Sequence, residues 1–227
     1  MVYKNRMEIR RFVIPDTHGC ARTFYHLFHQ ILQVRKTDRV YLLGDMIDRG
    51  PKSKELLDLL MELQSRGFFI SCLRGNHEQM LLDASLSPKN IQTWVLNGGF
   101  ATLDSFGISK VANIPRRYLD FLRSLPLYIE VEDFILVHAG MNFEDGTPFS
   151  DSRAMLWSRN LTIDKRQTSN RRLICGHTPH SQNTVRASLA ADIITLDNGC
   201  VYREHGLGTL SALELNSLEL VFQPNID

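Results

Sequence analysis

The chain has 227 residues and a formal net charge of +1, with 26 Lys and Arg against 25 Asp and Glu. This length fits one domain, and a charge near zero gives no sign of binding to DNA, RNA or an anionic membrane. No apolar stretch approaches the roughly 18 residues that a spanning helix needs, and residues 1–11 lack the apolar core of a secretory signal. We therefore expect one cytoplasmic, monomeric domain over residues 1–227, without nucleic-acid or membrane partners.

Short apolar runs that are rich in branched or aromatic residues divide the chain and indicate buried strands. These runs are residues 11–15, 40–44, 68–73, 134–137 and 173–175. Apolar residues at helical spacing predict helices over residues 21–34 and 53–66, and a weaker one over 116–125. Gly67 is placed to end the second of these helices.

The C-terminal part has a different pattern. Short alternating runs, separated by turn residues, predict hairpins there. They are residues 193–196, 200–203, 211–215 and 219–222. Strand–helix alternation followed by such a meander predicts an α/β (α+β) fold in which two packed mixed β-sheets are flanked by helices, an α/β/β/α sandwich.

The four cysteines stand far apart and form no C-x-x-C pair, so neither a structural zinc site nor a redox motif is expected. Cys72 and Cys175 lie within apolar runs, and we expect both to be buried, reduced thiols. No Ser or Cys occupies a nucleophile motif, which argues against covalent catalysis.

Polar residues follow each of the five apolar runs. The segments are Asp16-Thr17-His18-Gly19, residues 44–50 (GDMIDRG), residues 74–78 (RGNHE), His138-Ala139-Gly140 and Gly176-His177-Thr178. In α/β proteins the carboxyl ends of neighbouring strands meet at one edge of the sheet, where ligands bind. Five strands that each deliver Asp, Asn or His to that edge predict one converging site.

The residue types of this site indicate its chemistry. Histidines, carboxylates and one amide oxygen suit Mn²⁺, Fe or Zn²⁺ rather than a thiolate-bound metal. Two such ions, bridged by a carboxylate, lower the pKa of a water molecule and bind the phosphoryl oxygens during an in-line displacement. Arg49 and Arg74 in the same loops can bind phosphate bidentately. The sequence therefore predicts a metal-dependent phosphoesterase.

The motif series D-x-H-G, G-D-x-x-D-R-G, G-N-H-E, H-x-G and G-H-T resembles the phosphoprotein phosphatase family of the calcineurin-like metallophosphoesterases. The short chain, the segment Trp94 to Gly99 and the sequence Leu156-Trp157-Ser158-Arg159 are similar to its compact bacterial and phage branch. The resemblance implies a calcineurin-like fold and two divalent metal ions, with Mn²⁺ expected first and Fe or Zn²⁺ as alternatives.

The resemblance also implies a role for each motif residue. Asp16 and His18 would hold metal one, Asp45 would bridge the two metals, and Asn76, His138 and His177 would complete metal two. His77 would be the general acid beside the leaving-group oxygen, with Asp48 orienting it and keeping it protonated. Arg49, Arg74 and Arg159 would bind the phosphoryl oxygens. Glu78 is expected to be structural rather than catalytic.

The implied activity is that of a serine/threonine protein phosphatase, in which a metal-bridging hydroxide attacks the phosphomonoester directly. Phosphoproteins, phosphopeptides or small phosphate esters would be its substrates. The alternative is symmetrical hydrolysis of diadenosine tetraphosphate, because those hydrolases share the motif set. Pro179 stands where many nucleases of the superfamily carry the second His of G-H-x-H, which argues against the nuclease branches. A non-catalytic relative would have lost Asp45, Asp48 or His77, and all three are present.

Overall fold

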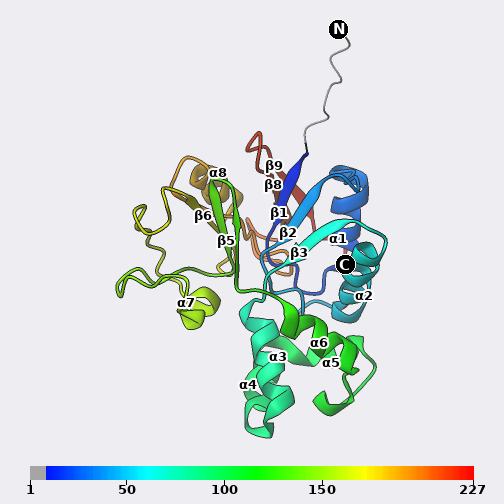
Figure 1. The fold of residues 1–227 in the computed structure, drawn as a ribbon. Helices are drawn as coiled ribbons and strands as arrows, with labels where there is room; N and C mark the ends of the chain where they lie inside the picture. Colours follow the sequence, from blue (N-terminus) through cyan, green and yellow to red (C-terminus); the bar gives the residue numbers. More distant parts are fainter. Residues whose placement is uncertain (1–8) are drawn as a thin grey trace.

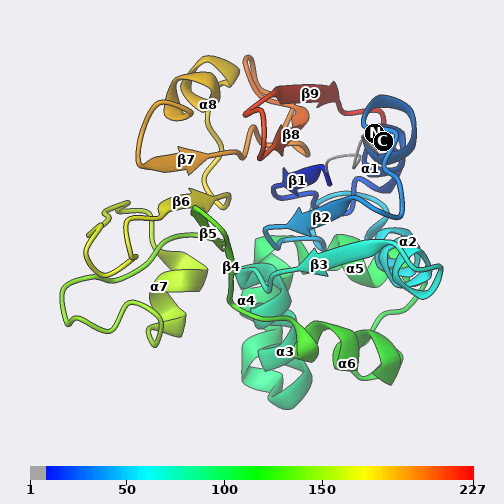
Figure 2. The same cartoon turned by 45° about the horizontal axis from the view of Figure 1, so that its top comes forward.

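The computed structural model describes residues 9–227 (Figure 1). Most of the N-terminal segment judged to lack a secretory signal therefore lies outside the described residues. Two β-sheets form the centre of the molecule, and Figure 2 shows them side by side. Among residues 9–227, no helix combines the length and the apolarity needed to cross a bilayer.

The first sheet has the strand order β3-β2-β1-β8-β9. Its strands are β1 (Arg11–Ile14), β2 (Arg39–Leu42), β3 (Phe69–Cys72), β8 (Thr209–Glu214) and β9 (Leu220–Pro224). The first three are parallel, and β8 joins the edge of β1 in the antiparallel direction. The carboxyl ends of β1, β2 and β3 therefore meet at one edge, as the motif order predicts.

The second sheet has the order β4-β5-β6-β7. Its strands are β4 (Tyr128–Val131), β5 (Phe134–Val137), β6 (Arg172–Cys175) and β7 (Ile193–Thr195). β5, β6 and β7 are parallel, and β4 pairs with β5 in the antiparallel direction. All four residues of β5 are buried, which explains why the sequence of this strand is apolar without interruption.

Alternate side chains of the strands fill two different cores. Val13 and Tyr41 of the first sheet pack with Leu136 and Ile174 of the second, between the two sheets. Phe12 and the other residues on the opposite face of the first sheet pack against helices. Because successive side chains of a strand point to opposite faces, one face of the first sheet packs against the second sheet and the other face packs against helices. The result is a sandwich with helices outside, so the predicted fold class is confirmed.

Helices flank both sheets. Helix α1 (Ala21–His26) and the π-turn η1 (Leu27–Ile31) pack with α2 (Ser53–Ser65) over the first sheet, and α7 (Ser152–Trp157) and α8 (Gln182–Ser188) lie beside the second. Between β3 and β4 the chain forms a third helical layer, residues 76–124, called the helical segment below (Figure 1). It consists of α3 (Asn76–Leu86), η2 (Pro88–Asn90), α4 (Ile91–Trp94), η3 (Val95–Gly99), α5 (Phe100–Ser105), η4 (Val111–Asn113) and α6 (Arg116–Ser124).

Several predicted elements are confirmed and others are wrong. The helices predicted over 53–66 and 116–125 are present within a residue of these bounds, and the hairpin of 211–215 with 219–222 is β8–β9. The helix predicted over 21–34 ends at residue 31, and Gln33 is left-handed with φ 46°. All four cysteines are buried and free.

The strand predicted over residues 200–203 is wrong. This stretch is a turn and loop. β7 therefore forms no hairpin with residues 200–203, and it pairs in parallel with β6. The side-chain amide of Asn198 holds the loop by donating to the carbonyls of His180, at 2.7 Å, and Gly206, at 3.0 Å. These tertiary hydrogen bonds override the alternating pattern of the sequence.

Candidate metal centre

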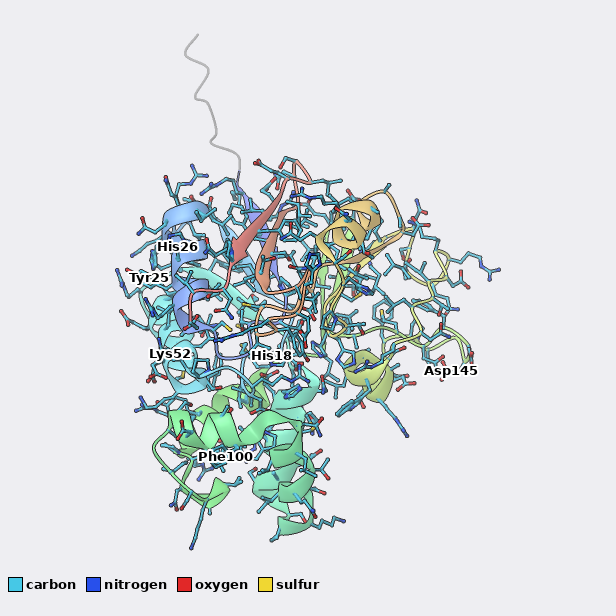
Figure 3. All side chains as sticks on the ribbon, turned by 180° about the vertical axis from the view of Figure 1, so that it is seen from behind. His18, Tyr25, His26, Lys52, Phe100 and Asp145 are labelled. Carbon is cyan, nitrogen blue, oxygen red and sulfur yellow. The ribbon has the colours of Figure 1, made fainter. Side chains whose placement is uncertain are left out.

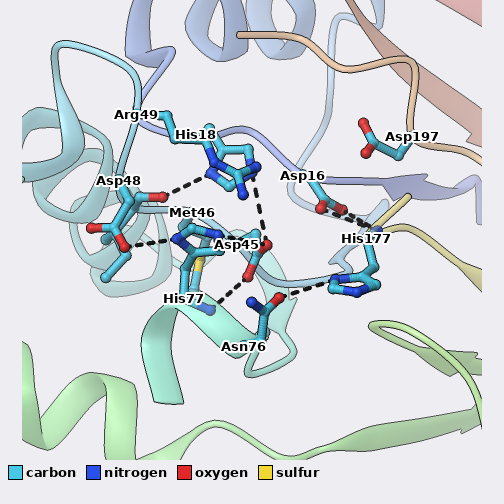
Figure 4. Close-up of polar contacts among 12 residues, drawn as sticks. Asp16, His18, Asp45, Met46, Asp48, Arg49, Asn76, His77, His177 and Asp197 are labelled. Carbon is cyan, nitrogen blue, oxygen red and sulfur yellow. Dashed lines mark hydrogen bonds and ion pairs between the residues drawn. The ribbon is translucent and has the colours of Figure 1, made fainter. Parts of the chain in front are cut away.

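The loops that follow β1, β2, β3, β5 and β6 bring the five motif segments together, and Figure 4 labels residues from all of them except the segment after β5. His18 lies in the interior between the sheets and the helical segment (Figure 3). Three of the predicted ligands have left-handed backbones, with φ 43° at His18, 49° at Asp45 and 67° at His177. Non-glycine residues rarely adopt this region, and such strain is concentrated at functional sites.

Two motif glycines allow carboxylates to approach the backbone closely. A Cβ atom at Gly75 would lie 2.2 Å from Oδ1 of Asp45, and one at Gly176 would lie 2.1 Å from Oδ1 of Asp16. Neither distance is possible for a real side chain. Any larger residue at these two positions would push the carboxylates out of the site, which explains why the G-N-H-E and G-H-T segments begin with glycine.

Three potential ligand atoms face one another on one side of the site. Asn76 Oδ1 lies 2.9 Å from His138 Nε2 and 3.0 Å from His177 Nδ1, and these two ring nitrogens are 3.1 Å apart. His138 Nδ1 donates to the Leu43 carbonyl at 3.0 Å, which leaves a lone pair on Nε2, and burial lowers the pKa of His138 far below its usual value. A lone pair and an amide oxygen at 2.9 Å repel each other unless a cation lies between them. The donor set therefore fits a divalent metal ion.

Asp45 connects this group to a second one. Its Oδ1 accepts the backbone N–H of His77 at 3.0 Å, at the first turn of α3. Its Oδ2 lies 3.5 Å from His138 Nε2 and 3.7 Å from His18 Nε2. Within residues 9–227, two sets of side chains place their ligand atoms within 4.8 Å of one another: His18, Asp45 and His77, and Asp45, His138 and His177. Asp45 belongs to both sets, which is the position that a bridging ligand must occupy.

The other side of the site is arranged differently. His18 Nδ1 donates to the Ile47 carbonyl at 2.9 Å, and its Nε2 accepts from Arg49 Nη1 at 2.7 Å. Asp16 accepts the backbone N–H of His177 at 3.1 Å with both carboxylate oxygens. Burial and the nearby carboxylate of Asp197 raise the pKa of Asp16 well above its usual value. A cation beside Asp16 would remove this electrostatic penalty.

Asp197 lies at the site but was not predicted from the sequence. It is buried next to Asp16 (Figure 4), and its Oδ1 accepts the Gly199 backbone N–H at 2.7 Å. The sequence pattern predicts a turn at Asp197-Asn198-Gly199. However, Asp197 follows β7 as the other motif residues follow their strands, and the same rule applied to the run 193–196 would have found it.

His77 and Asp48 form the predicted acid pair. His77 Nδ1 lies 2.8 Å from Asp48 Oδ2, while His77 Nε2 is buried and has no hydrogen-bond partner within the described part of the chain. Burial lowers the pKa of His77 and raises the pKa of Asp48 to about 7, because it opposes a charge on either group. The pair alone therefore disfavours the imidazolium that Asp48 is expected to maintain. A bound phosphate dianion would bring the negative charge that favours protonated His77.

Glu78 fixes the loops of the site through hydrogen bonds to their backbone. Its carboxylate accepts the backbone N–H groups of Asp45, Met46 and Gly75 at 2.8 Å each, and that of Ile47 at 3.3 Å. These bonds tie the G-D-x-x-D loop to the first turn of α3. The contacts agree with the structural role expected for Glu78.

The three predicted phosphate-binding arginines are placed differently. Arg49 is next to His18, and its guanidinium carbon lies 5.7 Å from the ring centroid of Tyr202. Arg159 is exposed. Burial of His177 is the main cause that lowers the pKa of His177 to about 4, and the charge of Arg159 is the second cause. The guanidinium of Arg74 instead donates to the carbonyls of residues 123 and 125 at the end of α6, at 2.6 and 3.2 Å. Arg74 Nη1 also donates to Gln79 Oε1 at 3.0 Å, so both terminal nitrogens have partners within the chain, and the phosphate contact of Arg74 stays a prediction.

Comparisons with known proteins agree with this site. The family model for calcineurin-like phosphoesterases matches residues 9–207, so the chain belongs to the calcineurin-like phosphoesterase family. Members of this family use a dinuclear metal site, and the His and Asp groups described above fit one.

Three relatives show how far the similarity extends. Serine/threonine-protein phosphatase 1 of Salmonella typhimurium is 30% identical over 204 residues, covering 84% of this chain and 87% of that protein. A symmetrical bis(5'-nucleosyl)-tetraphosphatase of Nitrosomonas europaea is 33% identical over 130 residues, covering 57% of this chain but only 44% of that protein. The structure of a protein serine/threonine phosphatase from Saccharomyces cerevisiae matches with a TM-score of 0.66 at 16% identity, covering 99% of this chain and 82% of that one.

Proposed function

We propose that this protein is a metal-dependent serine/threonine protein phosphatase that hydrolyses phosphomonoesters. One observation carries the proposal. The match to the Salmonella phosphatase runs along 84% of this chain and 87% of the relative, whereas the tetraphosphatase match covers less than half of its relative. The sequence match to the phosphatase thus extends over most of both proteins, whereas the match to this tetraphosphatase is confined to part of it.

The side chains at the site divide into metal-binding and substrate-binding groups. Asp16 and His18 would hold one ion, Asn76, His138 and His177 the other, and Asp45 both. Two divalent ions, with Mn²⁺ proposed first, would supply a water molecule of lowered pKa and neutralise charge on the phosphoryl oxygens. Arg49 lies beside His18, and the charges of both Arg49 and Arg159 act on His177, so two guanidinium groups could bind the substrate phosphate.

The chain's own proton transfer occurs at His77. The attacking water releases one proton to solvent and its oxygen bonds to phosphorus as the ester P–O bond breaks. The proton on His77 Nε2 passes to the departing alcohol oxygen, and solvent then reprotonates His77. The products are the alcohol and inorganic phosphate. Asp48 holds Nδ1 of the same ring at 2.8 Å, so the ring cannot turn away during the transfer.

Substrate side chains beside the phosphate have room next to Trp157. Its ring centroid lies 6.4 Å from that of His177, and it lines a cleft of about 440 Å³ with Met141, Asn142 and Ser158. We propose that this cleft receives residues flanking the phosphoserine or phosphothreonine. The protein would act as a monomer in the cytoplasm.

The second candidate is symmetrical hydrolysis of diadenosine tetraphosphate. It is favoured by the 33% identity of the matched 130 residues to the Nitrosomonas enzyme. The same metal and acid residues would serve, and only the groups around the leaving phosphate would differ.

A paired assay distinguishes the two candidates. Protein stripped with a chelator and reloaded with Mn²⁺ is given a phosphoserine peptide and diadenosine tetraphosphate side by side, with Asp45→Asn as the inactive control. Preferential, Mn²⁺-dependent release of phosphate from the peptide is the expected result. Preferential conversion of the dinucleotide to two ADP would overturn the proposal and favour the second candidate.

A further inference from the structure

The helical segment contacts the acid pair through two side chains with no role so far. The indole N–H of Trp94 donates to Asp48 Oδ2 at 2.9 Å, and the hydroxyl of Thr102 donates to Asp48 Oδ1 at 2.6 Å. Thr102 Oγ1 also accepts the backbone N–H of Asp48 at 2.9 Å. All three residues are fully buried. With His77 on Oδ2, both oxygens of the carboxylate are therefore held in fixed directions.

The chemistry of these donors matters as much as their geometry. An arginine in the same place would orient Asp48 and also cancel its charge. The indole N–H and the hydroxyl are neutral, so they orient the carboxylate and leave its negative charge to act on the His77 ring. Such donors suit a carboxylate that must stabilise an imidazolium during proton transfer.

The glycines next to Trp94 fit the same arrangement. A Cβ at Gly99 would lie 2.4 Å from the Trp94 ring, and a Cβ at Gly98, where φ is 106°, would lie 2.7 Å from Arg49 Cγ. The Gly98 carbonyl also accepts the Arg49 backbone N–H at 3.1 Å. The chain can pass between the indole and Arg49 because both positions lack a side chain.

We propose that Trp94 and Thr102 are positioning residues that act through Asp48. They fix the carboxylate so that it holds His77 Nδ1 and aims His77 Nε2 at the leaving-group oxygen. The inference rests on hydrolysis of a phosphate ester at this site, and it is independent of which ester is the natural one.

Leaving-group dependence tests this role. A serine alkoxide needs a proton as it departs, whereas a nitrophenolate does not, so loss of acid assistance affects an alkyl ester selectively. We expect Trp94→Phe and Thr102→Val to lower kcat on a phosphoserine peptide about tenfold, with KM nearly unchanged. On p-nitrophenyl phosphate the same variants should stay within about threefold of the original protein. Thr102→Ser, which restores the hydroxyl, should recover the peptide activity.

Tyr118→Phe is the matched control. Tyr118 is a buried aromatic residue of the same helical segment, and its hydroxyl donates to Asp58 at 2.7 Å, away from the acid pair. This variant loses a buried aromatic hydroxyl, its hydrogen bond to a carboxylate and the one that it accepts from Arg117 at 2.6 Å, and both activities should be unchanged. Equal losses on the two esters in Trp94→Phe and Thr102→Val, or no loss on either, would overturn the proposal and leave both residues as core packing.

A spectroscopic readout tests the contact without any activity. The chain has two tryptophans, and Trp157 is partly exposed. In ¹H–¹⁵N spectra, Asp48→Asn should shift the indole N–H resonance of Trp94 and leave that of Trp157 in place. Two unmoved resonances would contradict the hydrogen bond. If the original protein cleaved neither ester, the proposed function would fail, while this measurement would still decide the contact.

Discussion

Buried carboxylates occur in two regions of this molecule and are treated in opposite ways. Asp38, just before β2, accepts Arg10 Nη2 at 2.5 Å and Arg35 Nη2 at 2.9 Å. Burial opposes its charge, but these hydrogen bonds outweigh burial and hold the pKa of Asp38 below its usual value. At the metal centre, burial prevails and raises the pKa values of Asp16 and Asp45. The chain supplies counter-charges for Asp38 and leaves those of the site to a ligand.

The largest effect is expected at Asp45, which belongs to both candidate ligand sets. Asp45→Asn keeps the size of the side chain and an oxygen for the His77 N–H, but it removes the charge that both ions would share. Phosphate release should fall below detection, and calorimetry should show weaker binding of Mn²⁺ at both sites. If instead the variant bound two ions with unchanged affinity, Asp45 would not be the bridge.

His77→Asn should separate acid catalysis from metal binding. The variant loses the imidazole proposed to protonate the leaving group, so turnover of a phosphoserine peptide should fall about 10² to 10³-fold. Metal analysis should still find two ions per chain, because the proposed ligands remain. Loss of one ion would place His77 among the ligands, as its Nε2 distance of 3.9 Å from Asp45 Oδ2 allows.

The two motif arginines extend the comparison to positive charges. Arg49→Ala should lower kcat/KM about a hundredfold, since a cation beside the phosphate would be lost. Arg74→Ala should change kcat/KM less than about threefold and lower the free energy of unfolding by about 1 kcal/mol, because its hydrogen bonds to the end of α6 are lost. Steady-state kinetics and urea denaturation of both variants measure this contrast. A hundredfold loss of kcat/KM in Arg74→Ala would support the phosphate contact predicted for Arg74.

The contrast between these arginines shows what the sequence could predict. Motif residues with short side chains, such as Asp45, Asn76 and His138, are placed by the ends of their strands, and strand ends are readable from apolar runs. The long side chain of Arg74 is directed by tertiary partners 49 and 51 residues further along the chain, which no local pattern reveals. Residues 200–203 were predicted as a strand for the same reason, because the Asn198 side chain that holds this loop donates to the His180 carbonyl, 18 residues earlier in the chain.

The pH dependence of the metal-free protein should reveal the uncompensated carboxylates. Burial raises the pKa of Asp48 to about 7 and that of Asp197 to about 6, whereas an unfolded Asp titrates near 3.9. The folded state therefore binds protons more tightly, and stability is full below about pH 4 and falls as the pH rises through 6 to 7. Because the pKa values of His77 and His177 are lowered, these histidines contribute with the opposite sign below about pH 6.5, the unfolded value of His. We therefore expect chelator-treated protein to lose about 1 kcal/mol between about pH 6.5 and pH 8 in urea denaturation. Saturating Mn²⁺ should abolish the loss, and an identical slope with and without metal would contradict it.

The smallest effect is expected at Asp38, and its sign should be opposite. Since its folded pKa is depressed, its contribution is present above the unfolded value near 3.9 and is lost as the pH falls through the lower folded value. Asp38→Asn should therefore cost about 1 kcal/mol at pH 7 and less at pH 2.5. Urea denaturation of the two proteins at both pH values measures this difference. A constant difference would mean that shape and hydrogen bonding, rather than the charge paired with two guanidinium groups, determine the contribution of Asp38.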